Sequence, residues 1–284
     1  FDHLINWEVR RPEFANAYTY ASAINEAYAN DGIRKPRYHE YEMNAFKTGA
    51  YPQYYPNVNW VDEVFKDAAA TNIANMSLRG GGSKFRYFAM FNWVTDNGFI
   101  ANAKANDGYS TQNKSSKANL RTNLDIDLTP STKMTLNLLG TLAETNKPGD
   151  SADLWSMIYS LPATAFPVKT ENGLWGGNTT WDGTKNPVAQ SQAAAYTKGH
   201  NRSLYADMTL KQDLSSILPG LGAGFMLAYD NWASYVENHS KTYRYGSDNV
   251  QWKSGKPVFV SQYTAGTESE MNTGSELSAW KRNF

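Results

Sequence analysis

The chain has 284 residues and carries 27 basic and 27 acidic side chains, so its formal net charge is zero. This balance gives neither the basic excess typical of nucleic-acid binding nor an acidic tail. Cysteine is absent, which excludes a disulfide framework and a thiolate site. The histidines are scattered without the spacing of metal ligands, so we expect no metal and no cofactor; they are His3, His39, His200 and His239.

The N-terminal part of the chain predicts one strand end and one helix. Residues 1–10 alternate weakly and are typical of the end of a strand. Residues 15–30 have apolar side chains at three- and four-residue spacing, which predicts a helix that stops at Asp31 and Gly32. Residues 33–59 contain several prolines and are expected to be irregular, and residues 60–68 could form one or two helical turns.

A β-hairpin is predicted on the two sides of the glycine-rich segment 80–84, because side chains alternate with period two before and after it. The segment lacks the Lys-Ser/Thr ending and the following helix of a phosphate-binding loop, so we interpret it as a tight turn. One face of the hairpin would carry Ala74, Met76, Leu78, Phe85, Tyr87, Ala89, Phe91 and Trp93.

Two further hairpins are predicted. Residues 118–129 and 133–143 alternate around a short turn, and each run is about ten residues or more, which exceeds the usual strand of a globular sheet and fits a tilted membrane-spanning strand. Residues 204–211 and 221–230 alternate around Pro219. Asp125 and Asp127 lie on one strand face; we interpret them as polar lining rather than as a catalytic pair.

The remaining segments are long and polar. Residues 145–200 are expected to be mostly irregular, with a helix over 150–161. Residues 234–275 are also expected to be a long loop, with small strands at 241–245 and 257–263, and residues 275–284 begin another strand. Phe1 is no initiator residue and the chain stops abruptly at Phe284, so we expect both ends to lie within a longer protein.

The connections alternate between short turns and long loops. In an up-and-down antiparallel sheet, all short turns then fall at one edge and all long loops at the other, which is the pattern of outer-membrane barrels. The chain is rich in aromatic residues, at 14%, yet polar, with a mean hydropathy of −0.60. The predicted fold is therefore all-β: part of a large antiparallel up-and-down transmembrane β-barrel with long extracellular loops carrying short helices. A soluble β-sandwich is the alternative.

Several linked pieces of the sequence resemble the start of the barrel in SusC/RagA-type TonB-dependent transporters. The likeness covers most of the chain and is strongest over residues 15–145. The family usually has Asp before the tryptophan where this chain has Asn59. The pieces are Tyr55-Pro56-Asn57-Val58-Asn59-Trp60, Asn75-Met76-Ser77-Leu78-Arg79-Gly80-Gly81, Arg86-Tyr87-Phe88 and Asn97-Gly98.

The resemblance implies a barrel of about 22 strands closed by a plug. It also implies TonB-powered import of a glycan, oligosaccharide or peptide across the outer membrane of a Gram-negative bacterium, together with a SusD-like surface lipoprotein. Residues 1–284 would then form part of the barrel. The plug domain, its TonB contact and the remaining strands would lie outside this chain.

Aromatic side chains in or next to the long loops are the candidate ligand-binding residues, because an aromatic face matches the apolar face of a sugar ring. The alternative is that they pack the loops on each other and on a lid protein. The candidates are Trp155, Tyr159, Trp175, Trp181 and Trp232.

Three classes of function are compatible with these patterns. The first is the active importer. The second is a passive, structural or adhesive outer-membrane barrel. The third is a secreted carbohydrate-active enzyme, which needs a positioned pair of carboxyl groups on convergent loops. The sequence singles out no such pair and no catalytic residue, so we do not expect an enzyme.

Overall fold

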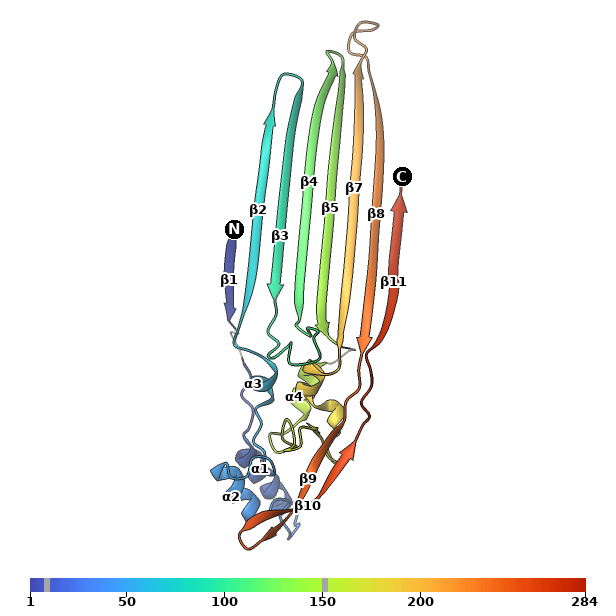
Figure 1. The fold of residues 1–284 in the computed structure, drawn as a ribbon. Helices are drawn as coiled ribbons and strands as arrows, with labels where there is room; N and C mark the ends of the chain where they lie inside the picture. Colours follow the sequence, from blue (N-terminus) through green and yellow to red (C-terminus); the bar gives the residue numbers. More distant parts are fainter. Residues whose placement is uncertain (8–10, 150–152) are drawn as a thin grey trace.

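The computed structural model describes residues 1–7, 11–149 and 153–284. Within these residues, eight strands form one antiparallel sheet in the order β1-β2-β3-β4-β5-β7-β8-β11 (Figure 1). The predicted all-β, up-and-down architecture is confirmed. The strands are β1 (Asp2–Trp7), β2 (Ala68–Gly81), β3 (Phe85–Asn97), β4 (Lys114–Thr129), β5 (Thr132–Pro148), β7 (Tyr196–Asp213), β8 (Gly222–Ser240) and β11 (Asn272–Asn283).

All long connections lie at one end of this sheet, and the three short turns lie at the other (Figure 1). The turns are residues 82–84, 130–131 and 214–221. We call the described residues 11–67, 98–113, 153–195 and 241–271 the loop body. The alternation of short and long connections predicted from the sequence is therefore confirmed.

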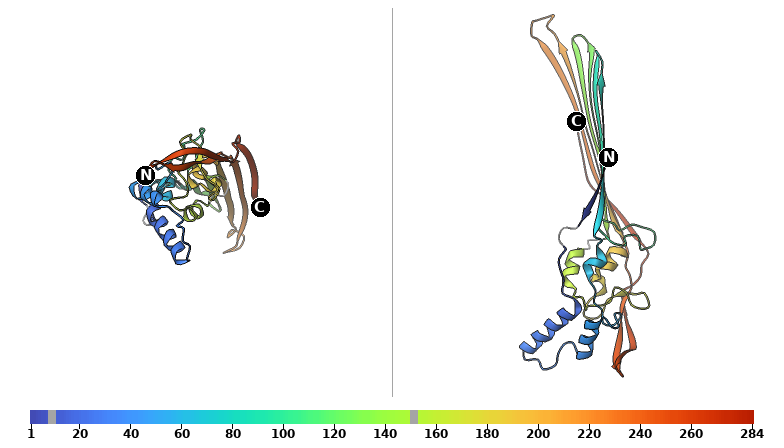
Figure 2. Two further views of the ribbon diagram at one scale, coloured as in Figure 1. Left: turned by 90° about the horizontal axis from the view of Figure 1, so that it is seen from below. Right: turned by 90° about the vertical axis from the view of Figure 1, so that its left-hand side faces the viewer.

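The loop body contains the helices and a small second sheet (Figure 2). Its helices are α1 (Ala17–Asn30), α2 (Glu40–Thr48), α3 (Trp60–Val64), α4 (Leu154–Ser160), α5 (Pro187–Gln192) and the 3₁₀ helix η1 (Gly183–Lys185). Its strands, in the order β10-β9-β6, are β6 (Trp175–Gly176), β9 (Tyr245–Lys253) and β10 (Lys256–Ala265). Among the described residues, no helix has the length and apolar character needed to cross a membrane.

Several boundaries differ from those expected. Residues 33–59 are not uniformly irregular, because α2 forms there: the His39 N–H donates to Glu42 Oε2 at 2.7 Å, and Gly49 ends the helix at φ 70°. The strand expected over 241–245 is wrong, since β9 begins at Tyr245. Helices α5 and η1 were not predicted. Residues 8–10 of the expected first strand and residues 150–152 of the expected helix lie outside the described part.

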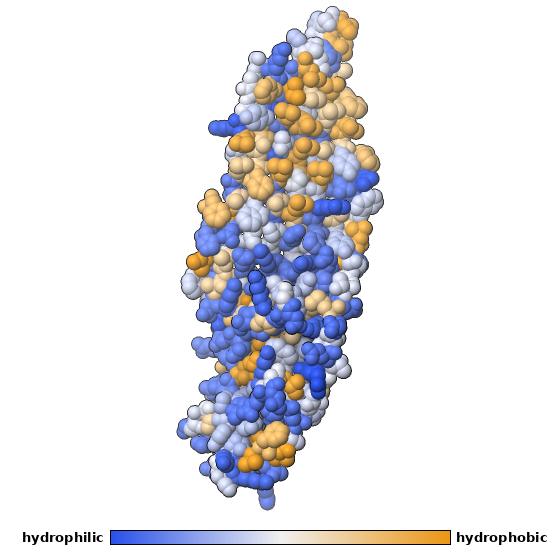
Figure 3. All heavy atoms as spheres, viewed as in Figure 1, coloured by the Kyte–Doolittle hydropathy of each residue, from blue (hydrophilic) through white to orange (hydrophobic). Residues whose placement is uncertain are grey.

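One face of the large sheet carries a belt of apolar side chains arranged in cross-strand rows. In one such row, Ala74 lies opposite Trp93, and Trp93 lies opposite Ala118. Many of these side chains are exposed, and apolar residues gather over the upper strands in Figure 3. We call this the apolar belt; its exposed large members include Met76, Leu78, Phe85, Tyr87, Phe91, Trp93, Leu120, Leu142, Leu204, Phe225 and Leu227.

The opposite face of the same strands, called the polar face here, carries hydrogen-bonded amide and hydroxyl groups. Asn92 Nδ2 donates to Asn75 Oδ1 at 2.5 Å, and Asn119 Nδ2 donates to Asn92 Oδ1 at 3.2 Å. Thr141 Oγ1 extends this row by donating to Asn119 Oδ1 at 3.0 Å. Such mutual pairing satisfies polar groups across the strands and leaves this face suited to water.

Asp125 belongs to the same polar face. Thr135 Oγ1 donates to its Oδ1 atom at 2.8 Å, across the β4–β5 pair. The contact supports the interpretation of Asp125 as a polar lining residue.

The principal buried core of the chain lies in the loop body. Short helices α3, α4 and α5 bring together apolar side chains that come from distant segments. The buried members are Trp60, Val61, Val64, Ile100, Ala103, Leu154, Ile158, Leu161, Ala165, Phe166 and Val188. A second cluster joins α1 and α2 to the β9–β10 hairpin, where Tyr41 and Trp252 stack with ring centroids 4.8 Å apart.

Asn186 ties the segments around α5 together from a fully buried position. Its Oδ1 atom accepts from the N–H groups of Val188 at 3.1 Å and Ala189 at 3.2 Å, which caps α5. Its Nδ2 atom donates to the carbonyls of Gly176 at 3.1 Å and Val168 at 3.3 Å. One side chain therefore satisfies four backbone groups of three segments.

Candidate functional site

Helix α4 presents two of the candidate aromatic residues on one exposed stripe. Asp153 caps the helix by accepting from the Ser156 N–H at 3.1 Å. Leu154 and Ile158 are buried in the principal core, so the other side of the helix faces outward. Trp155 and Tyr159, four residues apart, lie there with 38% and 64% of their surface exposed.

These two rings continue into a row of four. Phe65 stacks on Trp155 with centroids 4.9 Å apart and planes inclined by 24°. Trp155 lies 6.1 Å from Tyr159, and Tyr159 lies 5.4 Å from Phe14. We call Phe14, Phe65, Trp155 and Tyr159 the aromatic row. It combines three chain segments into one elongated apolar strip.

Hollows lie along the aromatic row. A hollow of about 480 Å³ is lined by Phe65, Trp155, Asp96 and Ser115 among others. Asp96 and Ser115 lie opposite each other on β3 and β4, with the side-chain alternation of the polar face. A further hollow of about 360 Å³ adjoins Trp155. The row therefore lies at the loop end of the polar face.

Trp181 lies near the end of the aromatic row that Phe14 and Tyr159 form. It lines a hollow of about 220 Å³ together with Phe14 and Tyr159. Its backbone N–H donates to Asn178 Oδ1 at 2.7 Å, which fixes the turn that carries it. The structure therefore brings Trp155, Tyr159 and Trp181 into one region, although 26 positions separate the first from the last.

An ionised carboxyl group lies next to Trp181. Burial acts to raise the pKa of Asp182, but hydrogen bonds from the backbone and side chain of Thr184 and from Tyr245 outweigh it and hold that pKa below its ordinary value. Asp182 therefore stays charged at neutral pH. Its role is local, because it caps η1 by accepting from the Thr184 N–H at 2.9 Å.

Trp175 is engaged in packing. Lys169 Nζ lies 4.2 Å from the centroid of its ring, and Tyr243 meets it edge-on with centroids 6.1 Å apart. Burial raises the pKa of Tyr243 above its ordinary range. Trp175 packs against the principal core, as Phe65 and Trp181 also do. Its ring differs from theirs because Lys169 covers it and Tyr243 meets it, which leaves little of the ring for a ligand.

Trp232 lies within β8 and not in a loop. It is 39% exposed, and its neighbours on the adjacent strands are Ser203 and Lys281. It has the side-chain alternation of the polar face, and the ring contacts of the described residues do not connect it to the aromatic row. Trp175 and Trp232 are thus separate from the group formed by Trp155, Tyr159 and Trp181.

Phe14 and Phe65 are members of the row that the sequence did not indicate. Phe65 comes directly after α3, and the sequence places it with Val61 and Val64 on one side of the helical turns predicted over residues 60–68, but not in a ligand site. Phe14 comes shortly before α1, and only its residue type marks it in the sequence. The chemistry of the row is non-covalent: stacked and tilted rings with polar groups at the edge suit the flat, partly apolar faces of sugar rings or of peptide side chains.

No family model and no curated protein matches the chain. Among solved structures it is similar to the RagAB peptide importer in a "closed-closed" state, with 13% sequence identity and a TM-score of 0.43, over 87% of this chain and 32% of that chain. It is also similar to a structure of the RagAB peptide transporter, with 16% identity and a TM-score of 0.36, over 79% of this chain and 27% of that one. The chain therefore spans about a third or less of the length of these solved chains.

Proposed function

We propose that the eight strands of the large sheet are part of a barrel wall that spans a bacterial outer membrane. The supporting observation is that one set of strands has an exposed apolar belt on one face and a hydrogen-bonded polar face on the other. On β8 the belt runs from Ala223 to Ala233. Ten residue steps measure about 33 Å along a strand, and a tilt of about 40° projects this to about 25 Å, the height of the apolar band of such barrels.

In this proposal, the apolar belt faces lipid and the polar face lines an aqueous lumen. The short turns then lie on the periplasmic side and the loop body lies outside the cell, as is general for these barrels. The aromatic row at the loop end of the polar face would lie at the outer mouth of the lumen. A solute entering from outside would meet it first.

The function proposed is active import of an oligosaccharide or a peptide through this barrel. Coupling to TonB would act through a plug outside this chain, and a SusD-like surface lipoprotein would deliver the solute; both expectations rest on the sequence resemblance. The observation that carries the binding role is the exposed aromatic row at the mouth. We assign ligand contact to Trp155, Tyr159 and Trp181, whereas Trp175 and Trp232 remain weaker candidates.

Deletion of the gene that encodes the intact protein should abolish growth on one class of solute in a panel of glycans and peptides. Radiolabelled uptake of that solute should also stop when an uncoupler collapses the proton-motive force. Uptake that survives the uncoupler would instead indicate a passive barrel, and normal growth on every solute would indicate a structural or adhesive one.

Replacing both exposed rings of α4, Trp155→Ala with Tyr159→Ala, should raise the half-saturating solute concentration by roughly tenfold or more, because each stacked ring contributes about 0.5–1.5 kcal/mol. Uptake by the intact protein in cells is the measurement. Phe259→Ala is the matched control, since Phe259 is also an exposed loop-body aromatic, at 52%, but lies on β10. Equal effects of the two variants would contradict the role assigned to the row.

A further inference from the structure

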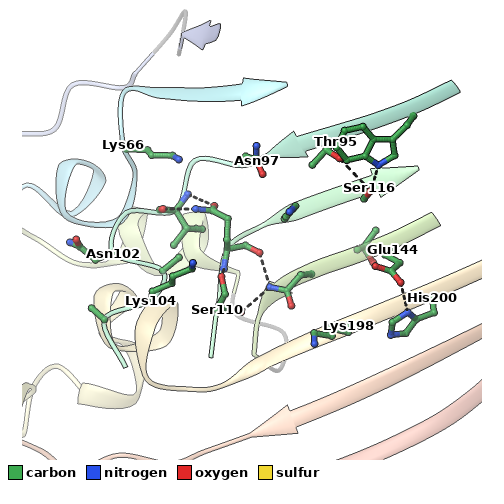
Figure 4. A pocket seen from close by; sticks show the side chains of 18 residues that line it. Lys66, Thr95, Asn97, Asn102, Lys104, Ser110, Ser116, Glu144, Lys198 and His200 are labelled. Atoms are coloured by element: carbon green, nitrogen blue, oxygen red, sulfur yellow. Dashed lines mark hydrogen bonds and ion pairs between the residues drawn. The ribbon is translucent and has the colours of Figure 1, made fainter. Parts of the chain in front are cut away.

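A further and larger hollow lies on the face that carries the apolar belt, beyond its loop-side border. It measures about 890 Å³ and opens between the ends of the strands and the segment 98–113 (Figure 4). Thr95 and Ser116, which lie opposite each other on β3 and β4, line it. Both have the same side-chain alternation as Trp93, the last aromatic residue of the belt, so the hollow continues the lipid-facing side of the proposed barrel.

The charges in this hollow are mostly positive. Lys66 and Lys104 come from the connecting segments, and Lys114 and Lys198 come from strand ends. Among the described residues, none of these four ammonium groups takes part in an ion pair. The single carboxylate, Glu144, has its Oε1 atom 3.5 Å from His200 Nδ1.

Figure 4 shows how these groups are arranged around the hollow. Lys66 and Lys104 lie on the loop side, whereas Lys198, Glu144 and His200 lie on the strands. Glu237 is a further acidic group, opposite Lys198 on β8, and its Oε1 atom lies 3.6 Å from His200 Nε2. Glu144 and Glu237 thus both lie next to His200 and form no ion pair with the four lysines. The lysines are therefore available to bind an anion.

An apolar groove adjoins the hollow. It measures about 340 Å³, shares Glu144 and His200 with the hollow, and is lined by Leu142, Leu277 and Arg202 among others. Leu142 is 62% exposed and Leu277 is 61% exposed. A ligand with one charged end could therefore place that end among the lysines and an apolar chain over the leucines.

Trp93 lies where the apolar belt meets the hollow, since it belongs to the belt and also lines the hollow. Its Nε1 atom donates to Ser116 Oγ at 3.1 Å, and 36% of its surface is exposed. Tryptophan at the edge of an apolar band is typical of the level of lipid headgroups. Lysine binds phosphate as a compact point charge, and basic clusters at this level attract anionic lipids.

We propose that this hollow and groove bind an anionic, phosphate-bearing lipid of the surrounding membrane. The phosphate lies among Lys66, Lys104, Lys114 and Lys198, and an acyl chain lies over Leu142 and Leu277. The proposal rests on the proposed membrane placement of the strands. It is independent of which solute the barrel carries.

The test uses the intact protein in detergent micelles, with native mass spectrometry as the readout and three probes: phosphatidic acid, phosphatidylcholine and inorganic phosphate. Phosphatidic acid should bind at least roughly tenfold more tightly than phosphatidylcholine. Neutralising all four lysines to Gln should remove most of that preference. The matched control neutralises four other exposed lysines, Lys133, Lys211, Lys253 and Lys256, and should leave the preference unchanged.

The competing outcomes are distinct. Inorganic phosphate binding as tightly as phosphatidic acid would overturn the lipid assignment, because the acyl groove would contribute nothing. An equal loss in the control variant, or no preference in the native protein, would overturn the site itself. Fractionation of the same variants tests the membrane placement separately, since a strand sheet that does not span the membrane would leave even the native protein in the soluble fraction.

Discussion

Replacing Leu227 with Arg should lower the free energy of unfolding of the intact protein in phospholipid vesicles by about 2–4 kcal/mol. Leu227 lies near the middle of the apolar belt, opposite Met208 on β7, and is 51% exposed. A charged side chain on the lipid face of a barrel strand costs this amount near the bilayer midplane because the charge loses its water. A urea titration followed by tryptophan fluorescence measures the change.

Met226→Arg is the matched control, since Met226 is the neighbouring residue and is 63% exposed. It lies opposite Thr209 on the polar face, where the proposed lumen provides water for the new charge. We expect little change in the unfolding free energy for this variant. Equal destabilisation by the two substitutions, or none by either, would mean that the apolar belt does not face lipid.

Asn186→Ala should lower the local opening free energy of the loop body around α5 by about 2–4 kcal/mol. The substitution leaves the buried N–H groups of Val188 and Ala189 and the buried carbonyl of Gly176 without their side-chain partner, and it removes one of the two hydrogen bonds to the half-buried carbonyl of Val168. Each unsatisfied buried group costs about 1–3 kcal/mol, with partial recovery by water. Hydrogen exchange of residues 166–192 in the folded, intact protein measures this local opening.

Asn16→Ala is the comparison for the capping contribution alone. Asn16 is exposed and caps α1 through one contact, the Thr19 N–H at 2.9 Å. We expect a loss of about 1 kcal/mol there, confined to α1. If Asn186→Ala caused no larger loss than Asn16→Ala, the two carbonyl contacts of Asn186 would contribute nothing to the loop body.

The hairpins could be predicted because alternation determines both the faces and the pairing of a strand. The side chains grouped on one face of residues 74–93 are those that the register brings together, such as Met76 opposite Phe91. A glycine-rich turn left few alternatives for that register. The strands proved longer than the apolar runs, because polar residues such as Lys114 and Asn146 extend the ladder beyond the belt.

The loop body could be predicted only in part, because its helices are short and their signals are local. Helix α5 spans six residues, which is less than two full turns and gives too few positions to show a period. Helix α2 begins at Glu40, is preceded by a histidine cap, and depends on Glu42 accepting from the His39 N–H. It lies within a segment that prolines mark as irregular. Burial against other segments, and not propensity, stabilises such helices.

The candidate site could also be predicted only in part. Trp155 and Tyr159 could be predicted because they are aromatic residues in a long loop. The row itself required contacts between Phe14, Phe65 and Trp155, which come from three separate segments. The sequence predicts Trp232 at the margin of a loop because the alternation fades after residue 230, whereas β8 continues to Ser240.

Because the principal core lies in the loop body, the stability of the loop body would depend on water, whereas the stability of the strands that carry the apolar belt would depend on lipid. Burial in the loop body removes apolar surface from water, so unfolding of the loop body should show a positive heat-capacity change. Sulfate should strengthen the hydrophobic contribution to its stability, and cooling should weaken that contribution. The apolar belt would exchange contacts with acyl chains instead, so bilayer thickness would govern its stability. In calorimetric scans of the intact protein in vesicles of different acyl-chain length, the unfolding temperature of the strands should therefore change, and that of the loop body should stay the same.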